Sequence, residues 1–310
     1  MDGLLREIRK DILIAGTGAL ATLFAARLSS SGYRVTMLGS WQEALTALNS
    51  RGAYLQGVGA FPVRAVAEAA ECRGARYALV LVKAWQTERT ARALAECLAP
   101  DGLAVTLQNG LGNREQLVAA LGEPRVVLGV TTVGATLLGP GEVRLGGEGT
   151  IMLEEHPALP PLVAMLRRVG FMVEIVPNAQ PWLWRKLVIN AAINPLTALL
   201  RVPNGALLAS PAARELMGAL AEETATVARA LGHLLSEDAS PATWAEEVAR
   251  RTAQNYSSML QDVLRGAPTE IDAICGAIVR QGAALGIPTP FHTTMWRLVR
   301  ALGEAQAIPG

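Results

Sequence analysis

The sequence predicts two domains, an α/β domain with a mostly parallel sheet followed by an all-α domain. Three observations favour this division. The length of 310 residues suits two hydrophobic cores better than one. Short apolar runs alternate with helical patterns up to residue 176, and after Pro177 the pattern becomes helix after helix, with breaks at prolines. We therefore expect domains at residues 1–177 and 178–310.

Each element of the first domain follows from its periodicity. Strands are expected at residues 11–15, 34–38, 77–82, 103–107, 126–130 and 172–176. Helices are expected from residue 19 to about 30 and at 42–49, 87–98, 113–121 and 159–169. Residues 53–55 and 62–64 resemble a small hairpin, and the Gly-rich segment 132–153 favours antiparallel strands.

Composition limits the classes of partner. With 28 basic and 27 acidic residues the net charge is +1, which gives no reason to expect nucleic acid or an anionic membrane as partner. No apolar run approaches the ~20 residues of a membrane span, and Met1–Lys10 lacks the apolar stretch of a signal peptide. The cysteines, at 72, 97 and 275, form no CxxC pair. They are predicted to be reduced core thiols of a cytoplasmic protein, with neither a zinc site nor a structural disulfide.

A glycine motif follows the first expected strand. Gly16, Gly18 and Ala21 have the spacing G-x-G-x-x-A, which permits a tight turn, close approach of a pyrophosphate and close packing of helix on strand. The motif follows an apolar strand and opens a helix, so it indicates a Rossmann-type dinucleotide site rather than a plain glycine-rich turn. The residues expected to bind the cofactor there are Gly16, Thr17, Gly18, Ala19 and Leu20.

The end of the second strand bears on which nicotinamide cofactor binds. From Thr22 to Gln42 there is no acidic residue to hold a ribose 2′-hydroxyl, which favours NADPH over NADH. Ser40 can donate one hydrogen bond to a 2′-phosphate, and Arg51 is a further candidate. The alternative for Ser40 is a helix N-cap, with Glu43 completing a capping box.

Polar side chains follow two further strands, at the edge where ligands of open α/β sheets bind. Lys83 comes after the strand 77–82, and Asn109 follows the strand 103–107. The alternatives are a solvated loop charge and a simple Asn-Gly turn.

Reduction of a ketone needs a proton donor, and none of the three histidines (156, 233 and 292) lies in a polar constellation. Lys186, Asn190 and Asn194 have the spacing i, i+4, i+8 and share one helix face among apolar residues. Such a row lines a polar site or forms a surface stripe, and paired asparagines favour the site. We expect Pro195 to kink this helix.

A second group of polar residues lies near residue 260. Asn255 and Ser258 have the spacing i, i+3 and are expected to face the same way. Glu270 either opens the next helix after Thr269 or keeps Lys186 charged and oriented.

Together these segments resemble the ketopantoate reductase family. The matching strings are GTGALA at 16–21, KAWQ at 83–86, QNGLGN at 108–113, TT at 131–132, KLVINAAINPLTAL at 186–199, PNG at 203–205, NYSSMLQDV at 255–263 and TEID at 269–272. They cover nearly the whole chain in family order. The resemblance implies reduction of 2-dehydropantoate to (R)-pantoate with NADPH, in pantothenate biosynthesis.

By position, the resemblance implies that Lys186 is the general acid, with a near-normal pKa of about 10.4, and that Glu270 holds its ammonium or contacts substrate. The residues implied to bind the 2-keto acid are Asn109, Asn190, Asn194, Asn204, Asn255 and Ser258. Those implied to border the nicotinamide are Lys83, Asn109 and Thr132.

One departure from the family matters for the cofactor: Ser40 stands where NADPH-preferring members carry Arg, so NADH is the alternative cofactor. Some members form dimers through the helical domain, so a homodimer is also an expectation. Two rival functions are a reductase of another 2-keto acid or an imine, and a nucleotide-binding redox sensor without turnover. The sensor would be free to lose Lys186, Asn255 and Glu270, and all three are present.

Overall fold

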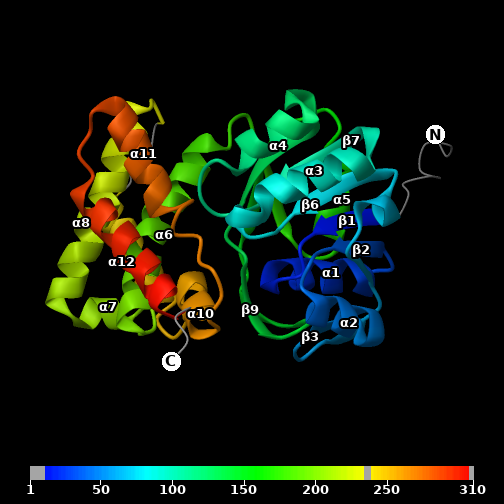
Figure 1. Cartoon of the computed structure of the whole chain (residues 1–310), viewed down its shortest axis with the longest axis horizontal. Helices are drawn as coiled ribbons and strands as arrows, with labels where there is room; N and C mark the ends of the chain where they lie inside the picture. The colour runs from blue at the N-terminus through cyan, green and yellow to red at the C-terminus, as the bar shows by residue number, and fades with distance from the viewer. Residues whose placement is uncertain (1–10, 234–238, 307–310) are drawn as a thin grey trace. The chain divides into compact units, whose positions relative to one another are not determined.

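The computed structural model describes residues 11–233 and 239–306, and the expected absence of a signal peptide at Met1–Lys10 lies outside the described residues. The chain divides into two compact units (Figure 1). Unit 1 contains the described residues up to Gln108 together with Asn113–Ala179. Unit 2 contains the described residues from Gln180 onward and also the short segment Asn109–Gly112.

Unit 1 is built on an eight-stranded sheet with the order β12-β11-β8-β7-β6-β1-β2-β5. All neighbouring pairs are parallel except β11 with β8. The order reverses between β1 and β6, which is the switch point where ligands of such sheets bind. The predicted Rossmann-type α/β fold is therefore confirmed. The strands are β1 (Asp11–Ala15), β2 (Arg34–Leu38), β5 (Arg64–Val66), β6 (Ala75–Val80), β7 (Leu98–Thr106), β8 (Val126–Thr131), β11 (Thr150–Glu154) and β12 (Met172–Val176).

Helices cover both faces of this sheet because its central strands are apolar on both faces. Ile12 and Ile14 of β1 join the core under α1 (Ala19–Ser30) and α5 (Pro160–Arg168). Leu13 points to the other core, formed with α3 (Thr87–Cys97) and α4 (Asn113–Leu121). This alternation is the period of two that a strand imposes on its side chains. Helix α2 (Gln42–Arg51) follows β2.

A second, four-stranded sheet packs against α1 and has the order β4-β3-β10-β9. Its strands are β3 (Ala53–Leu55), β4 (Gly59–Phe61), β9 (Gly134–Gly139) and β10 (Glu142–Gly147). The antiparallel strands expected in the Gly-rich segment are confirmed. The expected pairing of 53–55 with 62–64 is wrong, because a turn with Gly57 at φ +80° brings the chain back earlier, to β4. Arg64 instead begins β5, parallel to β2.

Unit 2 is all-α, as predicted. Its helices are α6 (Gln180–Leu200), α7 (Ala206–Ala209), α8 (Pro211–Ala230), α9 (Pro241–Arg251), α10 (Ser258–Leu264), α11 (Cys275–Leu285) and α12 (Pro290–Gln306). The long α6 contacts α8, α9, α10 and α12 and supplies much of the core. Pro195 lies inside α6 without ending it.

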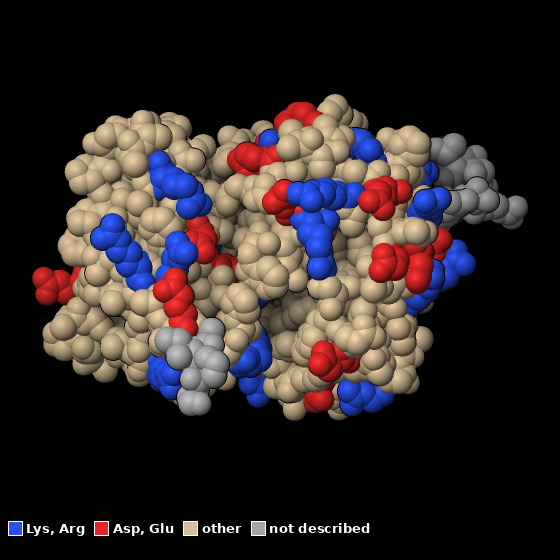
Figure 2. All heavy atoms as spheres, in the orientation of Figure 1, with Lys and Arg blue, Asp and Glu red and all other residues tan. Residues whose placement is uncertain are grey.

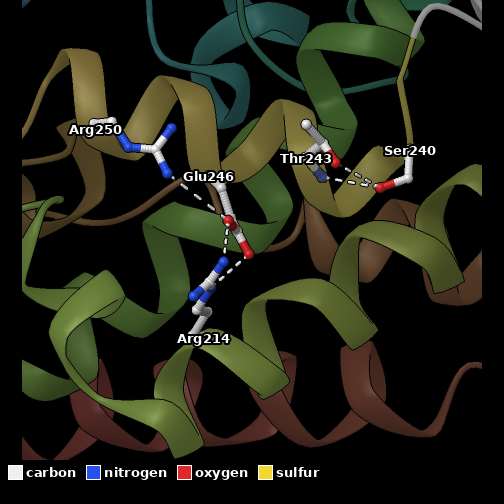
Figure 3. Close-up of polar contacts among 5 residues, drawn as sticks. All are labelled: Arg214, Ser240, Thr243, Glu246 and Arg250. Carbon is white, nitrogen blue, oxygen red and sulfur yellow. Dashed lines mark hydrogen bonds and ion pairs between the residues drawn. The ribbon is translucent and has the colours of Figure 1, made fainter.

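Surface ion pairs join neighbouring helices of this unit. The Glu246 carboxylate of α9 accepts two 2.6 Å hydrogen bonds from the Arg214 guanidinium of α8, and Arg250 lies 4.0 Å from it (Figure 3). Ser240 caps α9 by accepting the Thr243 N–H at 3.1 Å. Such exposed pairs are screened by solvent and contribute little to stability, so the apolar core carries it.

Two features of the described residues bear on whether a membrane or a metal ion is bound. Among them we find no helix whose length and hydropathy would suit a membrane span. The same part of the chain also has no group of three or more His, Cys, Asp or Glu residues arranged to hold a metal ion. Basic and acidic side chains are interspersed over the visible face (Figure 2).

Candidate active site

The glycine motif forms the turn between β1 and α1. Gly16 has φ +132°, and a Cβ there would lie 3.0 Å from the backbone carbonyl group of Leu81. The Gly16 N–H also donates to the Leu38 carbonyl at 2.8 Å. Close packing of the chain against two neighbouring strands therefore requires glycine at this position.

The next residues leave room for a phosphate. A Cβ at Gly18 would meet nothing within 4 Å. No side chain caps the N-terminus of α1, and its first turn carries no acidic residue. Uncapped N–H groups and the positive end of the helix dipole favour a bound anion. Of the predicted residues, Thr17 lies in this turn and Ala19 and Leu20 begin α1. The geometry fits a dinucleotide pyrophosphate.

The end of β2 is open and uncharged. Ser40 is exposed, and its hydroxyl makes no hydrogen bond to the residues that the structure describes. The alternative capping box is wrong: α2 begins after Trp41, one residue later than the motif requires, and has no side-chain cap. Arg51 lies at the far end of α2 and donates to the Pro140 carbonyl at 3.3 Å. Arg51 is the last of the ten residues of α2, a helix about 15 Å long that begins near Ser40.

The carboxyl ends of β6 and β7 are joined by the buried side-chain amide of Gln108, a residue that the sequence analysis did not single out. The Gln108 Nε2 donates to the Val82 carbonyl at 3.0 Å and to the Thr87 hydroxyl at 2.8 Å. Its Oε1 accepts from the Thr106 hydroxyl at 3.0 Å. Lys83, half-buried, directly follows Val82. Gln108 thus holds in place the two strand ends that carry Lys83 and Asn109.

Thr132 lies just after β8 and is exposed, but its hydroxyl has partners. It accepts the Thr150 N–H at 2.9 Å and donates to the Thr150 carbonyl at 3.4 Å. It therefore joins β8 to β11, and contact with a ligand would compete with these bonds.

The segment Asn109–Gly112 is seated on residues 270–273 of its own unit. The Leu111 N–H donates to the Ala273 carbonyl at 2.9 Å. Gly110 has φ +80°, and a Cβ there would lie 2.5 Å from the Ala273 carbonyl oxygen. The Asn109 Nδ2 donates to a Glu270 carboxylate oxygen at 3.3 Å. Two segments 161 residues apart are thus held side by side.

Glu270 is buried, with 6% of its surface exposed, and interacts electrostatically with Lys186 of α6. Burial of the ammonium lowers the pKa of Lys186 to about 8, and the Glu270 charge opposes this shift. The near-normal pKa expected from the sequence is therefore wrong, because desolvation destabilises the charged form of the lysine. The alternative role of Glu270 as a helix opener is also wrong, since α11 begins only at Cys275.

Two asparagines continue the row along α6. Asn190 and Asn194 follow Lys186 by one and two helical turns. Asn194 is buried, Asn190 half-buried, and neither side-chain amide hydrogen-bonds another described residue. The row is therefore not an exposed surface stripe, and both amides have hydrogen-bonding capacity for a ligand.

A buried hydroxyl pair ties α6 to the start of α10. The Thr197 hydroxyl lies 2.7 Å from that of Ser257 and donates to the Ile193 and Asn194 carbonyls at 3.0 Å. Ser257 is the N-cap of α10 and accepts the Leu260 N–H at 3.1 Å. The sequence analysis overlooked this pair, although a serine before an apolar helical run is a typical N-cap signal.

Asn255 and Ser258 flank this cap, and both are exposed. Only Ser258 is helical, and Asn255 lies in the preceding turn, so that they face the same way stays a prediction. Asn204 is buried, its N–H donates to the Asn255 carbonyl at 3.0 Å, and its Nδ2 donates to the Thr252 hydroxyl at 2.9 Å. The Asn204 Oδ1 is buried without a partner among the described residues.

The three histidines have structural surroundings. His292 is fully buried, 2.7 Å from the Thr224 hydroxyl and 3.0 Å from the Leu220 carbonyl. Burial lowers its pKa to about 4, so it is neutral at pH 7. His233 stacks on Trp184 with ring centroids 5.5 Å apart, and His156 contacts the Pro124 carbonyl at 2.9 Å.

Two family models match most of the chain. The family model "Ketopantoate reductase PanE/ApbA" matches residues 12–158, and "Ketopantoate reductase PanE/ApbA C terminal" matches residues 178–303. The 2-dehydropantoate 2-reductase of Archaeoglobus fulgidus is 36% identical over 298 residues, covering 94% of this chain and 97% of the relative.

Two solved structures are similar over almost the whole chain. One is a PanE/ApbA family ketopantoate reductase from Ralstonia eutropha JMP134, with a TM-score of 0.89 and 32% identity over 96% of this chain and 100% of that one. The other is a D-mandelate dehydrogenase with NADH and anilino(oxo)acetate, with a TM-score of 0.87 and 25% identity over 96% and 100%. The two matched family models and the identity to the Archaeoglobus relative show that the chain belongs to the ketopantoate reductase family.

Proposed function

We propose that this chain is an NADPH-dependent 2-dehydropantoate 2-reductase that forms (R)-pantoate, in pantothenate biosynthesis. The observation that carries the proposal is the group formed by the buried Glu270 with the half-buried Lys186 and Asn109, which joins a proton-bearing ammonium to a carboxylate and an amide. Relatives with 27–39% identity over most of the chain bear the same name.

A bound nicotinamide supplies the hydride for this reaction. We assign the pyrophosphate to the turn at Gly16–Leu20, which is supported by the open space at Gly18 and the uncapped α1 N-terminus. The exposed Ser40 hydroxyl is assigned to the ribose 2′-phosphate. Lys83, Asn109 and Thr132 are proposed to border the nicotinamide.

Lys186 is the proposed general acid. As the ketone carbon takes up the hydride, negative charge develops on its oxygen, and an adjacent ammonium stabilises that charge and donates the proton. With a pKa of about 8, Lys186 is about nine-tenths protonated at pH 7 and gives up its proton more readily than a solvated lysine. Glu270 orients the ammonium and keeps it charged.

The 2-keto acid requires hydrogen-bond donors for its carboxylate and partners for its hydroxyl. The amides of Asn190 and Asn194, without partners among the described residues, are suited to this task, and so is the buried Asn204 Oδ1, which can accept a substrate hydroxyl. Asn255 and Ser258 complete the proposed set, and Asn109 contacts the substrate from beside Glu270.

Two further expectations stay predictions. The buried thiols are compatible with a cytoplasmic location. Dimerisation through the helical unit would be measured by light scattering after size-exclusion chromatography.

The test is the initial rate of cofactor oxidation with 2-dehydropantoate, with NADPH and NADH measured side by side. Saturable turnover that prefers NADPH is expected, and Lys186→Met should lower kcat by at least about 100-fold. Preference for NADH would still support the reductase assignment but would overturn the proposed role of Ser40 at the 2′-phosphate. Absence of turnover from folded protein that binds the nucleotide would overturn the assignment and favour a non-catalytic sensor.

The likeness to D-mandelate dehydrogenase favours one second candidate, a reductase of bulkier 2-keto acids. Phenylglyoxylate, the 2-keto acid that yields mandelate, should be compared with 2-dehydropantoate in the same assay. A higher kcat/KM for phenylglyoxylate would move the assignment to this candidate.

A further inference from the structure

Two cysteines distant in the sequence meet at the amino edge of β6 and β7. Cys72 ends the short helix η1 (Ala69–Cys72), three residues before β6, and Cys97 directly precedes β7. The first residues of these strands, Ala75 and Leu98, are paired in the sheet. The Gly74 N–H donates to the Cys97 carbonyl at 2.8 Å. The two side chains belong to the same core cluster, and each thiol affects the pKa of the other.

The surroundings of the pair shift the pKa values of the two thiols in opposite directions. Both belong to the core cluster that α3 forms with the sheet, with 6% of Cys72 and 1% of Cys97 exposed. The hydrogen bond from Cys97, helped by the Arg64 charge, lowers the pKa of Cys72, although burial and Glu71 oppose the shift. The same contact and burial raise the pKa of Cys97. Cys72 is therefore the better nucleophile, and Cys97 holds its proton.

We propose that Cys72 and Cys97 form a modification site for hydroperoxides, which convert the pair into an intramolecular disulfide. The Cys72 thiolate attacks the peroxide and breaks its O–O bond, which gives a sulfenic acid and, after protonation of the leaving oxygen, water or an alcohol. The Cys97 sulfur then attacks the sulfenic sulfur, and the displaced hydroxide takes up the Cys97 proton and leaves as water. Two thiols are oxidised and one peroxide is reduced.

The place of the pair in the sheet decides what the bond does. The dinucleotide turn and the ends that carry Lys83 and Asn109 lie at the carboxyl edge of the strands, whereas Cys72 and Cys97 lie at the amino edge. A bond there closes the loop that contains β6 and α3 without touching the nucleotide turn. We therefore expect the disulfide to stabilise unit 1 against unfolding and to leave cofactor binding unchanged.

Cys275 provides a matched internal control. It is fully buried in the core of unit 2, and burial raises its pKa. Neither of the other cysteines belongs to its cluster within the described chain. A buried thiol of this kind is expected to react slowly and to form no intramolecular disulfide.

The experiment treats the full-length reduced protein with hydrogen peroxide, alkylates the remaining thiols in denaturant and maps the peptides without reduction. We expect one cross-linked peptide pair joining Cys72 to Cys97, reversed by dithiothreitol, while Cys275 is alkylated. The melting temperature should rise by about 5 °C and the KM for NADPH should not change. Cys275→Ala should behave as the wild type. In Cys97→Ala the sulfenic acid at Cys72 should persist and be trapped by dimedone.

The wild-type peptide map does not depend on any variant folding. If Cys72 and Cys97 stay alkylatable at peroxide concentrations that oxidise Cys275, the proposal is overturned. Cross-links only between separate chains would overturn it as well. A disulfide that forms but raises the KM for NADPH would contradict its placement away from the nucleotide turn.

Discussion

Replacing Glu270 by Gln tests whether this carboxylate acts through the Lys186 proton. Lys186 has a folded-state pKa of about 8, and Glu270 is the charge that raises it. Because the proposed acid is the protonated form of Lys186, kcat/KM should be high below pH 8 and should fall as pH rises through the Lys186 pKa. Removing Glu270 lowers that pKa, so the falling limb should move to lower pH.

The size of the shift follows from the charge that is lost. A neighbouring opposite charge moves a pKa by about 1 to 3 units, which would bring Lys186 to between about 7 and about 5. At pH 7 the protonated fraction would fall from about nine-tenths to between about one-half and about one-hundredth. We therefore expect kcat/KM at pH 7 to fall by about twofold to about 100-fold, and to recover toward the wild-type value as the pH is lowered.

The assay is the pH profile of kcat/KM for 2-dehydropantoate at saturating NADPH. Glu223→Gln is the matched control, since Glu223 is a half-buried carboxylate of the same unit that accepts the Phe291 and His292 N–H groups. In Glu223→Gln the decline of kcat/KM should occur at the same pH as in the wild type. A Glu270→Gln profile lowered by the same factor at every pH, with an unmoved limb, would refute action through Lys186 and indicate direct contact with substrate.

Three further changes test other parts of the site. Ser40→Arg should lower the KM for NADPH relative to NADH by about tenfold or more, since a guanidinium forms charge-assisted bonds to a 2′-phosphate; initial rates with both cofactors measure this. Gly16→Ala should raise the Kd for NADPH, measured by fluorescence titration, at least tenfold, which corresponds to about 1.4 kcal/mol. Gly32→Ala is the control: Gly32 also has a positive φ, +81°, but a Cβ there would meet nothing within 4 Å, so the Kd should not change. Thr197→Val should cost about 1–3 kcal/mol in denaturant unfolding and raise the KM for the 2-keto acid but not for NADPH, because Ser257 loses its buried partner.

Most of the fold could be predicted because its signals are local. The strand at 11–15 and the glycines that follow it can be recognised within about ten residues, and the alternating runs indicate the parallel sheet. The hairpin partner of 53–55 was misplaced because Gly57 permits a tighter turn than the sequence pattern alone indicates.

What could not be predicted depends on contacts between distant segments. No local pattern shows that Asn109–Gly112 lies on residues 270–273, because that contact is formed by tertiary packing. The meeting of Cys72 with Cys97 likewise depends on the adjacency of β6 and β7. The lowered pKa of Lys186 was missed for the same reason, since desolvation depends on neighbours contributed by other segments.

The choice of residue at position 186 has a physical reason that the composition makes visible. Among 28 basic residues the chain contains only three lysines, at positions 10, 83 and 186. Arginine serves the surface ion pairs well, because its guanidinium stays charged in any protein environment. The same property makes it useless as a proton donor. Burial can lower the pKa of an ammonium toward about 7, which makes its proton easier to transfer. Further burial would lower the pKa still more and leave the amine uncharged at neutral pH. Glu270, itself held by Asn109, opposes that loss. In the proposed mechanism the carboxylate therefore sets the pH up to which Lys186 can act as an acid.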